Sequence, residues 1–377
     1  MKKSKRIEIL SFCLSMVILS VLILSTILLI KNHQDNDVEF ISLRNQYRGG
    51  TIALELGEDH TVDFDELISD KNLIYDKASL VETENYKVKD KTLTPTQEGV
   101  FTVILRLENT QKKIIYHEHV MRVICYDVTK FVEINTVEDL CKMNDNKNGH
   151  YILNADLDLK DIENFQPIGN FPINNVFSGI FINPNGYVIK NLTIKTSTKI
   201  PHSPSGGCAG ALFGSTRNAY IDNIILENVS IDVSDCDSAF SYGAGLVAVD
   251  ANSLITNCKV TGKISATLYA GGIVGCADYT SLKNNLFIGT VIQKNGDLSH
   301  RPSAGGLAGW LTCCSIGQEN FASDVFGNIV AAKIQSESIA GKIAGLIQGD
   351  RIRDNMIYCE VFAPEVYETG RPIKPTY

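Results

Sequence analysis

Two histidines that flank a glutamate are the residues of this chain whose types come closest to a metal site. In the helical zinc motif of metallopeptidases, the second histidine lies four residues after the first. Here the first histidine is His117, the fourth residue after it is Met121, and the second histidine is His119. The segment also reads as a strand, where the helical spacing is unavailable. We therefore predict a pair of exposed strand residues, and we expect no metal-binding, cofactor-binding or catalytic residues and no cofactor.

Clustered carboxylates offer the other route to chemistry. The densest cluster is Asp350-Arg-Ile-Arg-Asp354, and Asp156 with Asp158 forms another. Polysaccharide lyases and hydrolases built on a β-helix use clustered Asp, Arg and Lys side chains, so a carbohydrate-active enzyme is one alternative. The other interpretation is that Asp350–Asp354 form a solvated turn near the end of the chain, and that Asp156 and Asp158 lie at the edge of a strand. Because glycosidases need two carboxylates at set separations, which a sequence does not reveal, we expect a protein that is not an enzyme.

The elements that would position such residues are set by a repeat. An apolar residue is followed within a few positions by Asn and another apolar residue, six times in the second half of the chain. Successive asparagines are 32, 34, 28, 35 and 35 residues apart, which predicts a solenoid of stacked units. Each amide would bond to the asparagines above and below, satisfying buried turn groups. The predicted ladder consists of Asn191, Asn223, Asn257, Asn285, Asn320 and Asn355.

A second repeat, short and rich in glycine, runs between the asparagines. Each copy has five or six residues bounded by polar turns, which is typical of a short strand. Glycine at one repeated position indicates close approach of neighbouring backbones or a sharp corner. Two or three short strands per repeat of about 30 residues, with no helical stretch, predict a parallel β-helix. The glycines are Gly210, Gly214, Gly245, Gly271, Gly275, Gly305, Gly309, Gly341 and Gly345.

These phrases resemble the GLUG repeat of bacterial surface proteins, which include the immunoglobulin A-specific metallopeptidases of streptococci. Ala270-Gly-Gly-Ile-Val-Gly275 carries the resemblance, and Tyr151-Ile-Leu-Asn-Ala-Asp-Leu-Asp-Leu159 is similar to the lead-in coils. The usual Asp-Gly-Asn-Gly turn is replaced by Asn183-Pro-Asn-Gly186. The resemblance covers residues 131–362 and implies an all-β, right-handed parallel β-helix without the peptidase domain. Adhesins, peptidases and other proteins share this scaffold, so activity does not follow from it.

The first 37 residues indicate the compartment. Residues 1–8 form a basic tail, and residues 9–30 are uncharged for long enough to cross a bilayer. We expect an uncleaved signal anchor because no small-residue cleavage site follows, and residues 31–37 would be a linker. The charge asymmetry predicts a cytoplasmic N-terminus and extracellular domains at a bacterial cell membrane.

The net charge indicates which classes of binding partner suit the chain, and the positions of the cysteines indicate which of them belong to the core. The chain has a net charge of −8, and residues 1–8 contribute +3, so the remainder carries −11. Such an acidic ectodomain is repelled by phosphate backbones, so we expect no nucleic-acid partner. Of the ten cysteines, Cys258 occupies a core position in the repeat and Cys313-Cys314 is the pair least like a core.

Residues 38–127 predict a small β-sandwich similar to bacterial Ig-like domains. The segment Leu93–Val103 carries this resemblance, and a hairpin formed by Val100–Leu107 and Ile114–Cys125 would be covered by strands at Val38–Leu43 and Thr51–Leu56. Near residues 136–144 we expect a short helix with Thr136 as its N-cap and Asp139 completing the capping box. It would cover the open end of the β-helix, and residues 363–377 would form a tail.

Together these features predict a membrane-anchored extracellular protein whose β-helix is a binding, adhesion or structural display module. Its partner would be an unknown protein or glycan of a host or a neighbouring cell. Two alternatives remain open: a carbohydrate-active β-helix enzyme, and a component of cell-envelope assembly or sensing.

Overall fold

The computed structural model describes residues 39–42, 50–68, 70–169, 175–195, 208–235, 240–312, 323–348 and 351–373. The expected anchor, residues 9–30, lies outside these ranges, as does the rest of the first 38 residues. Within the described ranges, the chain has no helix whose length and hydropathy would suit a membrane span.

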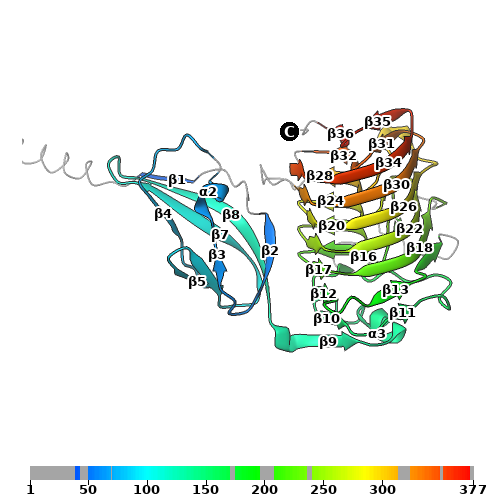
Figure 1. The fold of residues 1–377 in the computed structure, drawn as a ribbon, viewed down its shortest axis with the longest axis horizontal. Helices are drawn as coiled ribbons and strands as arrows, with labels where there is room; N and C mark the ends of the chain where they lie inside the picture. Colours follow the sequence, from blue (N-terminus) through cyan, green and yellow to red (C-terminus); the bar gives the residue numbers. More distant parts are fainter. Residues whose placement is uncertain are drawn as a thin grey trace, which may run out of the picture.

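The N-terminal domain consists of two small sheets (Figure 1). The larger sheet has a long hairpin at its centre, and the smaller one packs across it together with a single-turn helix. Tyr86 and Phe101 stack between the two sheets with ring centroids 5.4 Å apart. The larger sheet contains β1 (Glu39–Ser42), β2 (Thr51–Glu55), β4 (Lys77–Leu80), β7 (Gly99–Asn109) and β8 (Ile114–Tyr126). The smaller contains β3 (His60–Thr61), β5 (Tyr86–Lys89) and β6 (Thr92–Pro95), and the helix is α2 (Phe64–Leu67).

The arrangement of the first two strands differs from the expectation. We predicted that they would cover the hairpin, but β1 and β2 both pair with β8 in the same sheet, and both run parallel to it. Because β8 is 13 residues long, β1 pairs with its first part and β2 with its last part. The covering is done by the sheet β3-β6-β5 and by α2, whose Phe64 and Leu67 are buried.

The rest of the chain winds through four parallel sheets, coil upon coil, which is the arrangement of a β-helix (Figure 1). We name each sheet after its strand in one central coil: the β21, β22, β23 and β24 sheets. One coil therefore contains four strands, whereas the sequence predicted two or three. The difference lies in the glycine phrase, which is not one strand but two strands joined at a corner: residues 270–275 end β23, turn, and begin β24.

The β21 and β22 sheets contain eight strands each. The β21 sheet is β9 (Phe131–Ile134), β10 (His150–Leu153), β12 (Ile180–Ile182), β17 (Tyr220–Asp222), β21 (Leu254–Thr256), β25 (Ser281–Lys283), β29 (Asp324–Phe326) and β33 (Arg351–Arg353). The β22 sheet is β11 (Leu157–Asp158), β13 (Val188–Lys190), β14 (Thr193–Lys195), β18 (Ile225–Val233), β22 (Lys259–Ala266), β26 (Leu286–Gln293), β30 (Ile329–Ser336) and β34 (Met356–Phe362).

The β23 and β24 sheets contain six shorter strands each. The β23 sheet is β15 (Cys208–Gly210), β19 (Ser241–Ala244), β23 (Tyr269–Gly271), β27 (Ser303–Gly305), β31 (Ile339–Gly341) and β35 (Glu365–Tyr367). The β24 sheet is β16 (Phe213–Arg217), β20 (Val247–Ala251), β24 (Val274–Asp278), β28 (Ala308–Thr312), β32 (Ala344–Ile347) and β36 (Arg371–Pro372). Since β35 and β36 continue the coils to Pro372, the expected tail at 363–377 contains two further strands.

The first coil is closed by helix α3 (Val137–Lys142), which follows the short 3-10 helix η1 (Val128–Lys130) and strand β9. The Thr136 hydroxyl accepts from the Asp139 N–H at 3.1 Å, and the Asp139 carboxylate accepts from the Thr136 N–H at 3.0 Å. Leu140 and Met143 are buried in the core, whereas Cys141 is exposed. A second 3-10 helix, η3 (Leu298–His300), lies in a later turn.

Candidate functional site

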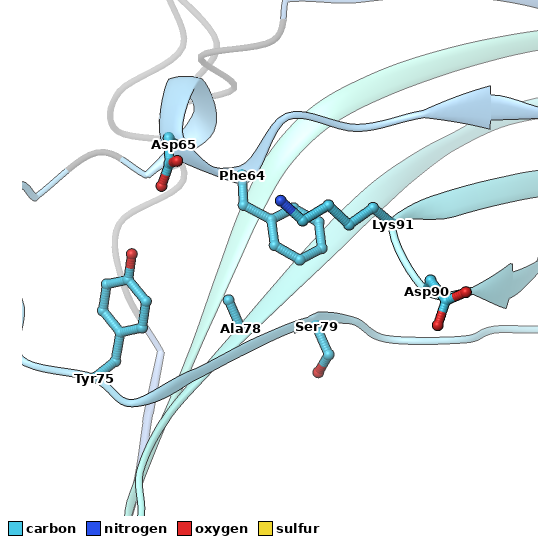
Figure 2. A pocket seen from close by; sticks show the side chains of 7 residues that line it. All are labelled: Phe64, Asp65, Tyr75, Ala78, Ser79, Asp90 and Lys91. Atoms are coloured by element: carbon cyan, nitrogen blue, oxygen red, sulfur yellow. The ribbon is translucent and has the colours of Figure 1, made fainter.

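A pocket of about 490 Å³ lies on the N-terminal domain, where α2, β4 and the β5–β6 turn meet (Figure 2). The Lys91 ammonium lies over the ring of Phe64, 5.1 Å from its centroid. The lining holds no histidine, cysteine or arginine; it consists of Phe64, Asp65, Tyr75, Ala78, Ser79, Asp90 and Lys91.

The histidine segment lies on β8, as a strand rather than a helix. His117 contacts the Phe40 ring edge-on at 6.2 Å between centroids, and the His119 ring nitrogen lies 3.0 Å from the Thr102 hydroxyl. Burial lowers the pKa of His119, and the neighbouring His117 lowers it further. Within the described part of the chain, His, Cys, Asp and Glu side chains form no group of three that could hold a metal ion.

The first pair of candidate carboxylates bonds to the backbone and to asparagine. Asp156 accepts a hydrogen bond from the Val188 N–H at 2.8 Å. Asp158 accepts from the Lys160 N–H at 3.0 Å and from the Asn191 amide at 2.6 Å. The hydrogen bond from Asn191 is the main reason that the pKa of Asp158 lies below its usual value, and the bond from the Lys160 N–H adds to this shift. The hydrogen bonds of the two carboxylates therefore link neighbouring coils at the start of the β-helix.

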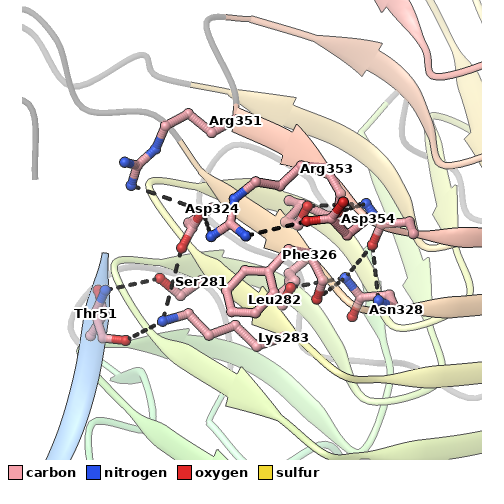
Figure 3. Close-up of polar contacts among 12 residues, drawn as sticks. Thr51, Ser281, Leu282, Lys283, Asp324, Phe326, Asn328, Arg351, Arg353 and Asp354 are labelled. Carbon is pink, nitrogen blue, oxygen red and sulfur yellow. Dashed lines mark hydrogen bonds and ion pairs between the residues drawn. The ribbon is translucent and has the colours of Figure 1, made fainter. Parts of the chain in front are cut away.

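The second cluster surrounds a buried carboxylate, Asp324, whose side chain is 4% exposed (Figure 3). Three cations from the two strands that flank β29 approach it: Lys283 of β25 at 3.9 Å, and Arg351 and Arg353 of β33 at 3.9 Å and 3.8 Å. Arg353 also pairs with Asp354 at 3.5 Å, while Asp350 lies outside the described residues. Residues of adjacent coils stand side by side in this sheet, so positions far apart in the sequence form one cluster.

An aromatic ring lies between two of these cations. The Arg353 guanidinium carbon is 4.2 Å from the Phe326 ring centroid, and the Lys283 nitrogen is 5.4 Å from it. Burial lowers the pKa of Lys283; the charge of Asp324 opposes this shift, and those of Arg351 and Arg353 add to it. The cations of this cluster are therefore held near Asp324 by ion pairs and by stacking on Phe326, rather than by hydrogen bonds to the Asp324 carboxylate.

The same cluster binds the N-terminal domain to the β-helix (Figure 3). Lys283 donates to the Thr51 carbonyl at 2.8 Å, and the Thr51 N–H donates to the Ser281 hydroxyl at 3.3 Å. Nearby, Ile124 of β8 forms one buried apolar cluster with Ile180 and Leu254 of the β21 sheet. The N-terminal domain therefore covers part of the outer face of that sheet.

The six predicted ladder asparagines do not form one column. Asn223 and Asn257 end strands of the β21 sheet in the left-handed conformation, with φ of 55° and 56°. Asn257 is exposed, and its amide donates to the Asp222 carboxylate at 2.8 Å. The expectation that Asn257 stacks inside the turn between Asn223 and Asn285 is therefore wrong. Asn284, Gly327 and Asp354 occupy the same left-handed position in later coils.

A second column lies one residue further along the chain and consists of the buried Asn285 and Asn328 and the half-buried Asn355. The Asn285 amide donates to the Asn328 side-chain oxygen at 3.1 Å, and the Asn328 amide donates to the Asn355 oxygen at 2.9 Å. In the coil before, the Cys258 N–H donates to the Asn285 oxygen at 2.9 Å. Cys258 is itself buried, and burial raises the pKa of its thiol. Asn328, which we did not predict, occupies the position of the column between Asn285 and Asn355. Asn320, which we predicted for this coil, lies outside the described residues.

Asn191 belongs to another corner, within the β22 sheet. Its φ is 61°, its amide donates to Asp158, and its oxygen accepts from the Asn228 amide at 2.6 Å. Among the described residues, the predicted ladder therefore combined asparagines from three positions: the left-handed end of the β21-sheet strands, the column beside it, and the corner at Asn191.

The glycines form the corner between the β23 and β24 sheets. Gly271, Gly305 and Gly341 lie in register on successive strands. A Cβ atom on Gly305 would lie 2.0 Å from the Ala308 carbonyl oxygen, so only glycine fits this corner. Gly275, Gly309 and Gly345 lie on strands of the β24 sheet, Gly210 on β15, Gly214 on β16, and Gly245 in the turn between β19 and β20.

The same corner brings the outer faces of these two sheets together. A Cβ on Gly309 would lie 2.8 Å from the Tyr269 Cβ, although the two residues belong to different sheets. The Tyr269 and Trp310 rings are in contact, with centroids 5.1 Å apart and planes tilted by 57°. Leu268, Ile339 and Leu346 join them in a cluster separate from the main core. The outer faces of the β23 and β24 sheets therefore cover each other.

The β22 sheet has a different outer face, on the side away from the N-terminal domain in Figure 1. Apolar side chains stand in register over its last three strands: Leu286, Ile329 and Met356 in one row, and Ile288, Ala331 and Tyr358 in the next. Ile288, Met356, Tyr358 and Phe362 are 44%, 50%, 66% and 53% exposed. Earlier strands carry the Lys259–Glu227 pair at 3.6 Å. On β30 and β34 the exposed charges are Lys333 and Glu360, which lie in register in the row between Tyr358 and Phe362. We name the apolar part, formed by β26, β30 and β34, the apolar face.

Comparison with known proteins gives remote similarities. No family profile matches the chain. Over 201 residues, 51% of this chain, it is 24% identical to Halomucin of Haloquadratum walsbyi (strain DSM 16790 / HBSQ001), of which the match spans 2%.

Two solved structures share 14% sequence identity with the chain. A candidate immunoglobulin A1 protease from Bacteroides ovatus has a TM-score of 0.39, over 64% of this chain and 85% of that one. An IgA1 protease has a TM-score of 0.33, over 78% of this chain and 26% of that one. This chain corresponds to a small part of Halomucin and of the second protease, so their activities do not follow for it.

Proposed function

We propose that this chain is a membrane-anchored extracellular protein whose β-helix displays the apolar face to a binding partner. The observation that carries the proposal is the contrast between the four sheets. The N-terminal domain covers part of the outer face of the β21 sheet, and the β23 and β24 sheets cover each other. The β22 sheet carries four large apolar side chains that are 44–66% exposed. Contiguous exposed apolar surface marks interaction sites in soluble proteins.

The geometry of the face suits a partner with a repeated or extended surface. Parallel strands in register place equivalent side chains about 4.8 Å apart, so the side chains of the face form regular rows across the strands. Contacts repeated along such a surface add by avidity even when each is weak. The charge of −11 outside the first eight residues favours a protein or a neutral glycan over a nucleic acid.

The proposed location rests on the sequence and on one cysteine. The basic residues before the 9–30 segment favour a cytoplasmic N-terminus. Cys208 is disulfide-bonded, and disulfides persist in oxidising compartments. A reporter that is active only outside the cell, fused at Tyr377, tests the topology: we expect activity, and an active cytoplasmic reporter at that position would overturn it.

We also propose that the N-terminal domain is an Ig-like module that holds the β-helix at a set orientation to the membrane, and that the coils are right-handed. The packing of two sheets against each other supports the first proposal. The right-handed rule for crossovers between parallel strands supports the second.

An array experiment tests the binding function against the enzymatic alternative. The full chain in detergent is applied to glycan and protein arrays, and the same panel is assayed for hydrolysis and lyase products. We expect binding without turnover. Cleavage of a bound glycan would favour the carbohydrate-active enzyme, and the absence of any ligand from both panels would favour a role in envelope assembly.

A further inference from the structure

The two ends of the β-helix differ. The first coil is closed by α3 and β9, with Leu140 and Met143 buried beneath them. At the other end, β33, β34, β35 and β36 are the last strands of their four sheets, and no other described strand pairs with their outer edges (Figure 1).

The core is also thinner at this end. In the coil before, Val325, Val330 and Ile334 are completely buried. Their counterparts in register, Ile352, Ile357 and Val361, pack against the core but remain half-buried. A free strand edge above a half-buried apolar layer is a template for pairing with another chain.

The last coil has a symmetrical layout around Cys359. This residue lies at the midpoint of the seven-residue strand β34. Two residues separate β34 from β33 on one side and from β35 on the other, and both flanking strands have three residues. Reversing the coil about Cys359 therefore aligns β34 with β34, and β33 with β35, of a second copy, residue for residue along the chain.

The residues brought together by this operation are complementary. Apolar residues of the core layer meet one another: Ile357 meets Val361, and Ile352 meets Val366, which lies in register with the core residue Ala340. On the outer side Met356 meets Phe362. Arg353, which is 54% exposed and pairs with Asp324 and Asp354 in its own chain, meets the acidic Glu365, which pairs with Arg371 in its own chain. Opposite charges and apolar pairs placed directly across strands are stabilising.

The backbone of β34 is oriented for the same pairing. The Met356 N–H donates to the Asn328 carbonyl of the coil before, at 2.9 Å. In a strand, alternate residues direct their N–H and C=O groups to opposite sides. The groups of residues 357, 359 and 361 therefore point to the free edge. In an antiparallel pair centred on Cys359 these are the groups that bond, Cys359 to its equivalent and Ile357 to Val361.

We propose that two copies of this chain associate end to end through their last coils, with β34 antiparallel to β34 about a two-fold axis at Cys359. This dimer does not require the ligand-binding role. It would join the two apolar faces into one continuous surface, with Tyr358 and Phe362 near its centre.

Substitution at Val361 tests the pairing directly. Proline removes the N–H that points to the free edge, a change that edge strands tolerate. Val361→Ala removes a similar amount of side chain but keeps the N–H. By light scattering with correction for detergent, we expect the full chain and Val361→Ala to have twice the chain mass in the micromolar range, and Val361→Pro to have the mass of one chain. Parent protein at single-chain mass, or a Val361→Pro dimer, would overturn the proposal.

A charge exchange gives a second test that does not depend on the folding of the proline variant. Arg353→Glu and Glu365→Arg each place like charges across the two-fold axis, and we expect dimerisation to weaken roughly tenfold in each. The double variant restores opposite charges and should regain the parent's dimerisation. Single variants that dimerise as well as the parent, or a double variant no stronger than either single one, would exclude this pairing register.

Discussion

The side-chain oxygen of Asn328 lies 2.9 Å from the backbone nitrogen of Asn285 and 3.1 Å from its side-chain nitrogen. One buried amide thus satisfies two donors of the neighbouring coil, and its own nitrogen donates to the Leu282 carbonyl at 2.9 Å. Stacking of this kind links successive coils at a corner where the chain turns and backbone N–H and C=O groups need side-chain hydrogen-bond partners.

Removing this amide should therefore destabilise the β-helix. Asn328→Leu removes the acceptor of the Asn285 backbone N–H and one of the two bonds of the Asn285 side-chain amide, whose other bond goes to the Ile255 carbonyl. It also removes the donor to the Leu282 carbonyl, and each buried group left unsatisfied costs about 1–3 kcal/mol. Asn257→Gly is the matched control, because glycine adopts the φ of 56° and only an exposed bond is lost, so its change should stay within about 0.5 kcal/mol. Thermal unfolding of both variants measures this. Equal stability of the two would mean that the column does not hold the coils together.

The glycine corner should tolerate no side chain. In Gly305→Ala the new Cβ would meet the Ala308 carbonyl oxygen at 2.0 Å, so the backbone must shift, at a cost of about 3 kcal/mol. At Gly186, φ is 75° but no atom lies within 4 Å of an added Cβ, so alanine there should cost about 1–2 kcal/mol. Denaturant unfolding compares the two, and a smaller loss for Gly305→Ala would contradict the close approach of the strands.

A buried carboxylate should make stability depend on pH. Asp250 accepts hydrogen bonds from the Thr216 and Thr280 hydroxyls and from the Ser253 N–H, the last at 3.3 Å. Burial raises its pKa above 3.8, and the hydrogen bonds only partly oppose this.

A raised carboxyl pKa stabilises the fold fully below the unfolded-state pKa, and this stabilisation is lost as the pH rises through the folded-state pKa. Asp250→Asn should therefore gain stability relative to the parent between pH 3.8 and neutral pH. Chemical unfolding at several pH values tests this sign. A stability difference that does not change with pH, or one that shifts in favour of the parent, would show that the three hydrogen bonds outweigh the burial.

The sequence predicted the stacked architecture but assigned asparagines from different positions of the coil to one ladder. Period and glycine spacing indicate parallel coils whatever the exact register. Two adjacent corner positions accept asparagine for different reasons, however: a left-handed φ at Asn257, and a buried ladder at Asn285. Single-letter matching cannot separate them, although the doublet Asn284-Asn285 shows both positions side by side.

The docking of the N-terminal domain could not be predicted. It depends on contacts such as Thr51 with Ser281, which are 230 residues apart. Period and propensity describe residues close together in the sequence and carry no signal for such a pair. The apolar face was missed for a related reason, since it becomes visible only when the strands are in register and the other outer faces are covered.

The central proposal, that the apolar face binds the partner, has one direct test. Ile288 lies on β26, the first of the three strands of the face and two strands away from the free edge, and is 44% exposed. Ile288→Lys should weaken binding to the ligand found on the arrays at least roughly tenfold, or about 1.4 kcal/mol. Lys263→Ala, over the charged part of the same sheet, should leave the affinity within a factor of about two. Surface plasmon resonance with the full chain measures both. Unchanged affinity in Ile288→Lys would contradict the proposal.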